Sequence, residues 1–340
     1  ITIFPLGTAY EEFQEMNSIN KRTKWFLKYP FKLKNFLERV VLSNYFGSYN
    51  SWKWISSNRI PDKVCSKIDE SDIVIINMEG TIHHNRTGGL ALLGLAKYAK
   101  EQGKKVALVN GSYQSMDGRV TRTVFKQVDF VSVREVKSFD YLKAHGVKVH
   151  LIPDFAFLAN ICEQSDFKLP SLKMKSSSKR CLYTTGVRAL DNHFDSLNFF
   201  KDIKQQVLIL KKKGFEIYFL QIEEKEEHLA QKLREIDVFV ISYKDNITYK
   251  NIGTLLKNFD LIVTGRYHVG IFGLMVNKPT LFLKSNTYKI EGLLQMFELK
   301  NLLVEQSDDL SKKIEVLSPA QIRLPTNQQY STFVNFLRNL

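Results

Sequence analysis

Short apolar runs alternate with amphipathic stretches along the chain from residue 72 onward. Apolar runs bounded by glycine or polar residues predict buried strands, and apolar residues three and four apart predict helices. The predicted strands cover residues 72–77, 105–110, 129–133, 148–154, 216–220, 237–241, 259–264 and 280–283. The predicted helices cover residues 90–102, 119–126, 135–145, 197–212, 225–236, 248–258, 267–276, 289–297 and 328–340. This alternation predicts parallel sheets with helices on both faces.

One polar stretch, residues 163–180, interrupts the alternation and carries the proline and serines that are typical of a linker. A chain of 340 residues also exceeds the size that one core usually serves. We therefore predict an α/β protein with two doubly wound, Rossmann-like domains that face each other across a cleft. The predicted domains are residues 1–165 and 175–325, followed by a C-terminal helix in 326–340.

The N-terminal part is less regular. Residues 1–6 are apolar enough for a first strand, and a helical stretch begins at about Tyr10. Residues 21–54 are basic and aromatic, with seven Lys or Arg between 21 and 39. The pattern favours two ordinary helices around Pro30, with the aromatic residues in the core. A segment on a membrane surface and a contact with single-stranded nucleic acid remain open.

Composition adds an excess of positive charge, because 49 Lys and Arg stand against 35 Asp and Glu, giving a net charge of +14. Such a surface favours an anionic partner, although much of the charge could lie on solvated helix faces. The three cysteines are widely spaced and match neither a disulfide framework nor a zinc site. No run is long enough to cross a membrane and no signal-peptide pattern opens the chain, so we expect a cytoplasmic protein.

The most informative stretch runs from residue 259 to 283. Gly265 bounds the predicted strand 259–264, and Arg266 and His268 follow where a helix begins. Open α/β sheets bind ligands at the carboxyl ends of their strands, and helix N-termini favour anions. Gly270 and Gly273 would let this helix lie close to its neighbour. The alternative for Gly-Arg-x-His is a capped turn whose side chains only face water.

Further cations follow other strands. Arg134 ends the strand 129–133, and Lys284 and Lys289 follow the strand 280–283. Arginine pairs with carboxylate or phosphate through two hydrogen bonds, and histidine exchanges protons near neutral pH. This set suits a small substrate with more than one anionic group. Motifs for nucleotide-binding loops, zinc proteases and α/β-hydrolases are missing, and the adjacent His83 and His84 lack further metal ligands.

Together these residues resemble the polysaccharide pyruvyltransferase family. The matching segments are Val131-Ser-Val-Arg134-Glu135-x-x-Ser138, Gly146-Val-x-Val-x-x-x-Pro153-Asp154-x-Ala156-Phe157, Thr264-Gly-Arg266-x-His268-x-x-Ile271, Lys278-Pro279 and Lys289-Ile-x-Gly292. The loop Asn77-Met-Glu79-Gly80-Thr-Ile-His83-His84 is similar to one that some members carry. The resemblance covers residues 72–292. An N-terminal Asn-Gly-Asp loop of the family has no clear counterpart, and Met78-Glu79-Gly80 replaces a glycine-rich stretch.

The resemblance implies a fold like that of two-domain, B-type glycosyltransferases (GT-B). It implies transfer of pyruvate from phosphoenolpyruvate to two hydroxyls of a sugar, forming a ketal, without a metal or cofactor. Arg266, Arg134, Lys289 and Lys284 would hold the donor, and His268 would be the general acid. The donor would bind the C-terminal domain. The N-terminal domain, with Asn77, Glu79 and His83, would bind the acceptor.

The acceptor implied is a surface polysaccharide or its precursor on undecaprenyl diphosphate, and the segment 21–54 would suit peripheral contact with an anionic inner membrane. The main alternative is a GT-B glycosyltransferase that uses a nucleotide sugar. There Arg266 and Lys289 would bind phosphates, and Glu79 or His83 would be the base. A nucleic-acid-binding protein is the third hypothesis, but it has only the net charge in its favour and no binding motif, so we expect no nucleic-acid partner.

Overall fold

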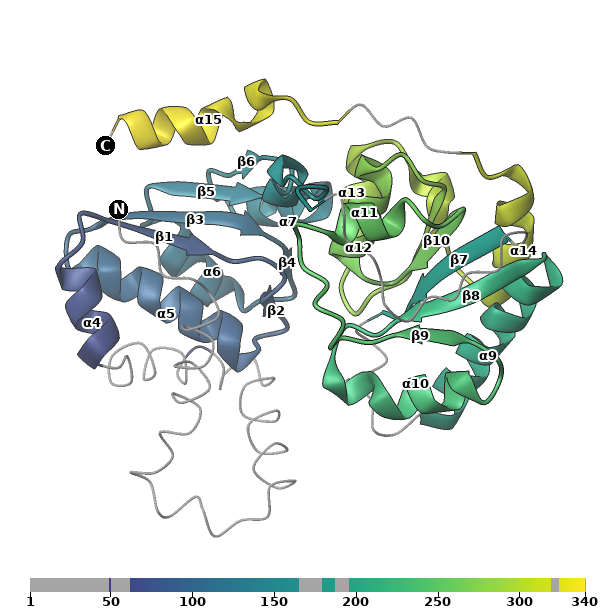
Figure 1. Ribbon diagram of the computed structural model, residues 1–340. Coiled ribbons are helices and arrows are strands. Elements are labelled where there is room, and N and C mark those ends of the chain that lie inside the picture. Colours follow the sequence, from purple (N-terminus) through teal and green to yellow (C-terminus); the bar gives the residue numbers. More distant parts are fainter. Residues whose placement is uncertain (1–48, 50–61, 165–178, 187–195, 319–323, 340) are drawn as a thin grey trace, which may run out of the picture. The chain divides into compact units, whose positions relative to one another are not determined.

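The computed structural model describes residues 49, 62–164, 179–186, 196–318 and 324–339. The predicted strand 1–6, the helix near Tyr10 and nearly all of the basic, aromatic segment 21–54 lie outside these residues. The chain forms two compact units (Figure 1). The first runs to Ile152 without Glu135–Lys137 and includes Tyr330–Leu340, and the second contains Glu135–Lys137 and Pro153–Gln329.

The first unit contains a parallel sheet of four strands in the part of it that is described. Their order is β1 (Ile73–Asn77), β3 (Lys105–Gly111), β5 (Phe130–Val133) and β6 (His150–Leu151). Its helices are α4 (Asp62–Asp69), α5 (Thr87–Glu101), α6 (Gly118–Phe125) and α7 (Val136–Ala144). Every residue of β5, and every residue of β3 after Lys105, is buried. Strands covered on both faces need such continuous apolar runs, which is why the sequence showed them plainly.

Two further features of this unit were not predicted. The short strands β2 (Ile82–His83) and β4 (Tyr113–Gln114) pair in parallel and so join the loops that follow β1 and β3. The C-terminal helix α15 (Asn327–Arg338) belongs here from Tyr330 onward, because Phe333 and Phe336 pack on Phe130 with ring centroids 5.5 and 4.8 Å away.

The second unit contains a six-stranded parallel sheet with the order β12-β11-β10-β7-β8-β9. The strands are β7 (Lys179–Thr184), β8 (Phe215–Leu220), β9 (Phe239–Ile241), β10 (Leu261–Thr264), β11 (Thr280–Leu283) and β12 (Leu303–Val304). The order runs outward in opposite directions from β7 and β10, as in a Rossmann fold. Ligands bind beside the carboxyl ends of the two strands at such a switch point.

Helices connect these strands. The α-helices are α9 (Ser196–Lys212), α10 (Glu227–Arg234), α11 (Ile252–Leu256), α12 (Tyr267–Met275), α13 (Lys289–Met296) and α14 (Ser307–Val316). The 3-10 helices are η3 (Phe155–Leu158), η4 (Glu224–Glu226) and η5 (Lys300–Leu302). The main segment of this unit begins at Pro153, and η3 near its start contacts α12.

The sequence analysis was wrong about one central strand. The predicted linker extended to Arg180 and no strand was predicted between residues 154 and 216, but β7 lies in the middle of the sheet and pairs with both β8 and β10. Its residues from Cys181 to Thr184 are fully buried. The strand 148–154 is also shorter than predicted, since only His150 and Leu151 pair with β5.

Glycines end three helices and allow a fourth to pack closely. Gly103, Gly146 and Gly214 follow helices with φ of +73°, +70° and +83°, a conformation that glycine adopts without strain. In α12, a Cβ on Gly270 would lie 2.0 Å from Cε1 of Phe282, and one on Gly273 would lie 2.6 Å from Oγ1 of Thr280. The two glycines therefore let α12 lie directly on β11, against its side chains.

Candidate functional site

Three strand-end loops of the second unit converge at the switch point. A Cβ on Gly265, after β10, would lie 2.3 Å from the backbone nitrogen of Gly186, after β7. A Cβ on Gly186 would lie 2.8 Å from the carbonyl oxygen of Lys284, after β11. Only glycine lets these backbones approach so closely. The carboxyl ends of β7, β10 and β11 therefore form one continuous backbone surface.

The helix α12 begins at this surface. Its N-cap residue is Arg266, whose side chain makes no cap, and the Arg266 backbone N–H donates to Oγ1 of Thr264 at 2.9 Å. The first N–H groups of a helix lack partners within the helix and carry a partial positive charge. The switch point thus offers an environment that favours an oxyanion.

His268 lies in the first turn of α12. Its side chain is 39% exposed, and its Nε2 is 3.7 Å from Oδ2 of the buried Asp154. The other carboxylate oxygen of Asp154 accepts the backbone N–H of Ala156 at 2.8 Å, which fixes the carboxylate. A protonated His268 would form an ion pair with it. The imidazole is therefore both oriented by a fixed acid and accessible to a ligand.

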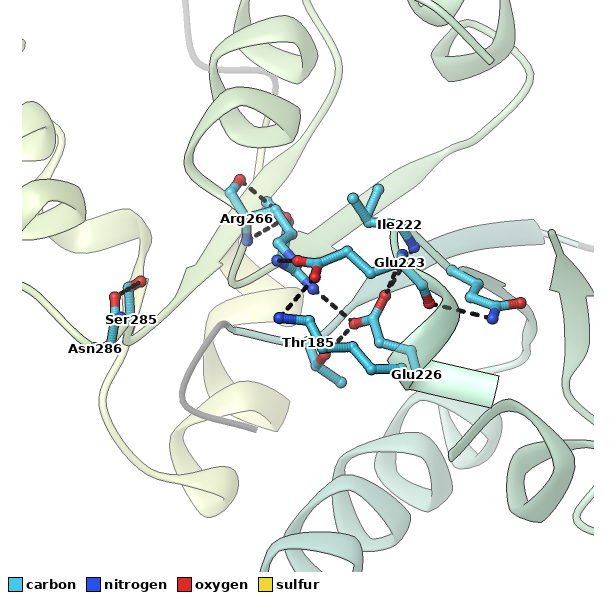
Figure 2. A network of polar contacts seen from close by, with 10 residues as sticks. Thr185, Ile222, Glu223, Glu226, Arg266, Ser285 and Asn286 are labelled. Carbon is cyan, nitrogen blue, oxygen red and sulfur yellow. Dashed lines mark hydrogen bonds and ion pairs between the residues drawn. The ribbon is translucent and has the colours of Figure 1, made fainter. Parts of the chain in front are cut away.

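Arg266 points into a cluster of carboxylates (Figure 2). Its Nη1 donates to Oε1 of Glu223 at 2.9 Å, its Nη2 donates to Oε1 of Glu226 at 2.8 Å, and its side chain is only 11% exposed. Sequence reasoning did not single out either glutamate. The available signal was their position: both lie in the acidic loop that follows β8, at the same edge of the sheet as Arg266.

The two predicted lysines also lie at this edge. Lys284 follows β11 and is exposed, with its Nζ 3.7 Å from Oε2 of Glu305. It lines a cavity of about 400 Å³ together with Thr185, Gly186, Phe199, Asp202 and Glu305. Lys289 is half-buried at the first position of α13. The structure therefore brings Arg266, His268, Lys284 and Lys289 to the carboxyl edge of one sheet.

The helix α13 lies close to a buried carboxylate. A Cβ on Gly292 would be 1.9 Å from Oε2 of Glu135, which is fully buried. Gly292 is therefore required for this packing, which gives a physical reason for the glycine in Lys289-Ile-x-Gly292.

The remaining predicted residues lie in the first unit, at the carboxyl edge of its sheet. Arg134 follows β5, is 1% exposed and donates from Nε to Oγ of Ser112 at 2.9 Å. Asn77 ends β1, and its Oδ1 is buried without a hydrogen-bond partner among the described residues. The carbonyl of Glu79 accepts the N–H of Ser112 at 2.7 Å, which joins the loops after β1 and β3.

His83 lies in the same edge region on β2. It is 6% exposed, and its Nδ1 is 2.9 Å from Nδ1 of His84, so one of the two rings carries a proton at this position. Burial, and then the charge of Arg86, lowers the pKa of His84. Glu79, His84 and Asn85 have positive φ values of 39°, 52° and 51°. Residues other than glycine rarely adopt a positive φ, and backbone strain of this kind is concentrated at functional sites.

Two further kinds of feature are absent from the described residues. No group of three or more His, Cys, Asp or Glu in that part of the chain could hold a metal ion. No helix there combines the length and the apolar character needed to cross a membrane.

Solved structures with the same fold include two UDP-GlcNAc 2-epimerases and a protein in complex with UDP. UDP-GlcNAc 2-epimerase from Neisseria meningitidis, bound to UDP-GlcNAc, is 13% identical over 85% of this chain and 82% of its own, with a TM-score of 0.58. The enzyme of the same name from Methanocaldococcus jannaschii is 16% identical over 82% of each chain, with a TM-score of 0.57. S. aureus MnaA with UDP is 14% identical over 82% of this chain and 79% of its own, with a TM-score of 0.54. The chain therefore has a GT-B-like fold built from Rossmann-like units.

The comparison with protein families is more specific. No curated protein matches the sequence. The family model for polysaccharide pyruvyl transferase matches residues 1–287, which include every predicted site residue except Lys289. Because this match covers most of the sequence, the chain belongs to the polysaccharide pyruvyl transferase family.

Proposed function

We propose that the protein transfers pyruvate from phosphoenolpyruvate to two hydroxyls of one sugar, in a surface polysaccharide or its lipid-linked precursor. Family membership supports a pyruvyl transfer to a saccharide. The observation that carries the donor assignment is the placement of Arg266 and His268 at the N-terminus of α12, at the switch point of the second unit. Phosphoenolpyruvate has a carboxylate and a phosphate, and this position favours oxyanions.

The reaction that we propose adds one proton to the methylene carbon of phosphoenolpyruvate and turns it into a methyl group. The first sugar hydroxyl adds to the central carbon and loses its proton, the carbon–oxygen bond to phosphate breaks, and the second hydroxyl adds and loses its proton. Of the two protons released, one balances the proton gained by carbon and the other leaves with phosphate. The products are the ketal and inorganic phosphate.

His268 is the residue that we propose as the acid. It is accessible, and its Nε2 lies 3.7 Å from Oδ2 of Asp154. The cations at the same edge, Lys284 and Lys289, would stabilise phosphate as it leaves. Positioning of donor and acceptor would supply much of the remaining rate acceleration.

The edge of the first unit has the features of a binding site for a neutral, hydroxyl-rich acceptor. The buried Oδ1 of Asn77 lacks a hydrogen-bond donor among the described residues, and a sugar hydroxyl would provide one. Glu79 and His83 could accept protons from sugar hydroxyls. Arg134 remains our prediction for a substrate-binding cation. We also keep the hypothesis that the acceptor is carried on undecaprenyl diphosphate, with residues 21–54 near an anionic membrane.

A second candidate is transfer from a nucleotide sugar. It is favoured by one observation, that solved structures of the same fold hold UDP or UDP-GlcNAc. In this case Arg266 and Lys289 would bind the diphosphate, and Glu79 or His83 would be the base. The two candidates differ in the donor and can be separated by binding alone.

The test is a thermal-shift titration of the full chain with phosphoenolpyruvate, UDP and UDP-GlcNAc. A ligand at about 100 times its dissociation constant stabilises by roughly 2.7 kcal/mol. We expect phosphoenolpyruvate to raise the melting temperature of the wild type and of His268→Ala, and Arg266→Ala to lose the shift. A shift with UDP or UDP-GlcNAc only would refute the phosphoenolpyruvate assignment and support the nucleotide-sugar candidate.

A further inference from the structure

The two glutamates that hold Arg266 differ in how firmly they are bound. Glu226 is the inner one and is 1% exposed. Its Oε1 accepts from Arg266 and from the hydroxyl of Thr185 at 3.1 Å, and its Oε2 accepts from the backbone N–H groups of Ile222 and Glu223 at 2.7 and 3.1 Å. Both oxygens are therefore fully engaged with fixed groups, and water cannot replace these donors.

Glu223 is the outer carboxylate and is 34% exposed. It binds Arg266 through Oε1, and its Oε2 is 2.8 Å from the exposed Nζ of Lys225. Its side chain also accepts a backbone N–H of η4 in a capping box with Glu226. Burial alone would raise its pKa, but Lys225 and Arg266 together keep the pKa below its usual value. If Arg266 were withdrawn, Glu223 would keep Lys225, the cap and water as partners.

Arg266 is thus anchored through one arm and held more weakly through the other. Its Nη2 bonds to the inner glutamate, whereas its Nη1 bonds to the outer one (Figure 2). Its Nε is buried and has no hydrogen-bond partner among the described residues. A guanidinium group binds carboxylate and phosphate well through two parallel hydrogen bonds, so its present pairing leaves part of its binding capacity unused.

We propose that Glu223 occupies the position on Arg266 that an oxyanion of the donor substrate takes, and that the donor displaces it while Glu226 keeps the guanidinium in place. The proposal rests on the proposed function, because it assumes an anionic donor at Arg266. Glu223 is then a residue that sets donor affinity, and Glu226 is a positioning residue. Glu223 is the member of this cluster that can be exchanged, since it is the more exposed glutamate and keeps Lys225 and its helix cap as partners without Arg266.

The proposal predicts that substitutions of the two glutamates that contact Arg266 change the affinity for phosphoenolpyruvate in opposite directions. Glu223→Gln removes the competing charge, so phosphoenolpyruvate should bind roughly three- to tenfold more tightly. In Glu226→Gln, one of the two carboxylate oxygens, both of which accept hydrogen bonds, is replaced by an NH2 group that faces other donors. Arg266 then loses its orientation, and the affinity for phosphoenolpyruvate should fall at least about tenfold. Loss of structure alone cannot produce the tighter binding expected of the first variant.

Glu224→Gln is the matched control. Glu224 lies in the same loop and is exposed, and the structure shows no hydrogen bond or ion pair for its side chain among the described residues. This substitution removes the same unit of charge and therefore measures the general electrostatic effect on an anion. The specific effect of Glu223 is the difference between the two variants.

The experiment is calorimetric titration of the full-length wild type and the three variants with phosphoenolpyruvate, with UDP-GlcNAc and inorganic phosphate as further probes. Tighter binding by Glu223→Gln than by Glu224→Gln supports the proposal. Equal affinities of these two variants, or tighter binding by Glu226→Gln, overturn it even if the wild type binds phosphoenolpyruvate, which leaves the proposed function standing. If no probe binds the wild type, both are refuted. If Glu226→Gln does not fold, as judged by circular dichroism, Glu223→Gln alone decides.

Discussion

The close packing of α12 on β11 makes a strong prediction about Gly270. In Gly270→Ala the new methyl group would lie 2.0 Å from Cε1 and 2.7 Å from Cζ of Phe282, whose side chain is fully buried. Carbon atoms in contact are about 3.5–4.0 Å apart. The ring or the helix must therefore move by roughly 1.5 Å in a packed core.

The expected loss of stability follows from two opposing terms. Overpacking of this kind typically costs about 1–3 kcal/mol, and the severity of the contact places it near the upper value. Alanine in place of glycine inside a helix returns about 1 kcal/mol. We therefore expect a net loss of about 2 kcal/mol. For a unit of this size this corresponds to a melting temperature lower by about 4–8 °C.

The measurement is thermal unfolding followed by circular dichroism, with a double-mutant cycle. Phe282→Leu removes the ring atoms that the methyl group meets, so Gly270→Ala/Phe282→Leu should be at least about 1 kcal/mol more stable than the sum of the single effects predicts. Gly88→Ala in α5 is the control, because its Cβ would meet its nearest neighbour, Cγ2 of Thr81, at an ordinary 3.5 Å. Additive effects in the cycle, or an unchanged melting temperature for Gly270→Ala, would refute the reasoning.

Three other predictions follow from single side chains. His268→Ala should lose turnover but keep the thermal shift with phosphoenolpyruvate; near-normal release of phosphate would exclude it as the acid. Burial opposes ionisation of Asp129, yet hydrogen bonds from Lys100 and from the N–H of Val106 lower its pKa below 3.8, so its stabilising effect is present at neutral pH and is lost as pH falls through that lowered pKa. In urea unfolding, Asp129→Asn should be less stable than wild type at pH 7, and the gap should close in acid. Burial raises the pKa of Cys181, so a thiol reagent at pH 8 should label it only after unfolding.

Local signals explain what the sequence predicted well. The helix α12 could be placed within one residue, because a glycine precedes it and Pro279 follows it, and both act on the neighbouring backbone. The ends of the helices predicted at 90–102 and 135–145 were also placed within one residue, because Gly103 and Gly146 follow them. The positions of Arg266 and His268 at a strand end followed directly from these boundaries.

Signals that depend on distant parts of the chain were missed. The strand β7 contains only a few apolar residues beside a basic, serine-rich stretch, and its strand character comes from pairing with β8 and β10 on both sides. Glu223 and Glu226 meet Arg266 across sequence separations of 43 and 40 residues. No local pattern encodes such a pair, because it forms only when the carboxyl ends of β8 and β10 lie at the same edge of the sheet.

Under the proposed exchange, the charge balance at Arg266 would give the switch point a selectivity that the bulk composition does not suggest. A chain with a net charge of +14 attracts many anions without distinction. At Arg266, however, the guanidinium already has two carboxylate partners, so an anion gains only the difference between its own hydrogen bonds and those of Glu223. An anion with one diffuse charge would gain little binding free energy by replacing Glu223. An oxyanion that forms two parallel hydrogen bonds, and whose second anionic group reaches another cation or the N-terminus of α12, would gain enough to displace the glutamate. Phosphoenolpyruvate has two such groups within one small molecule, so the proposed exchange would favour it over inorganic phosphate.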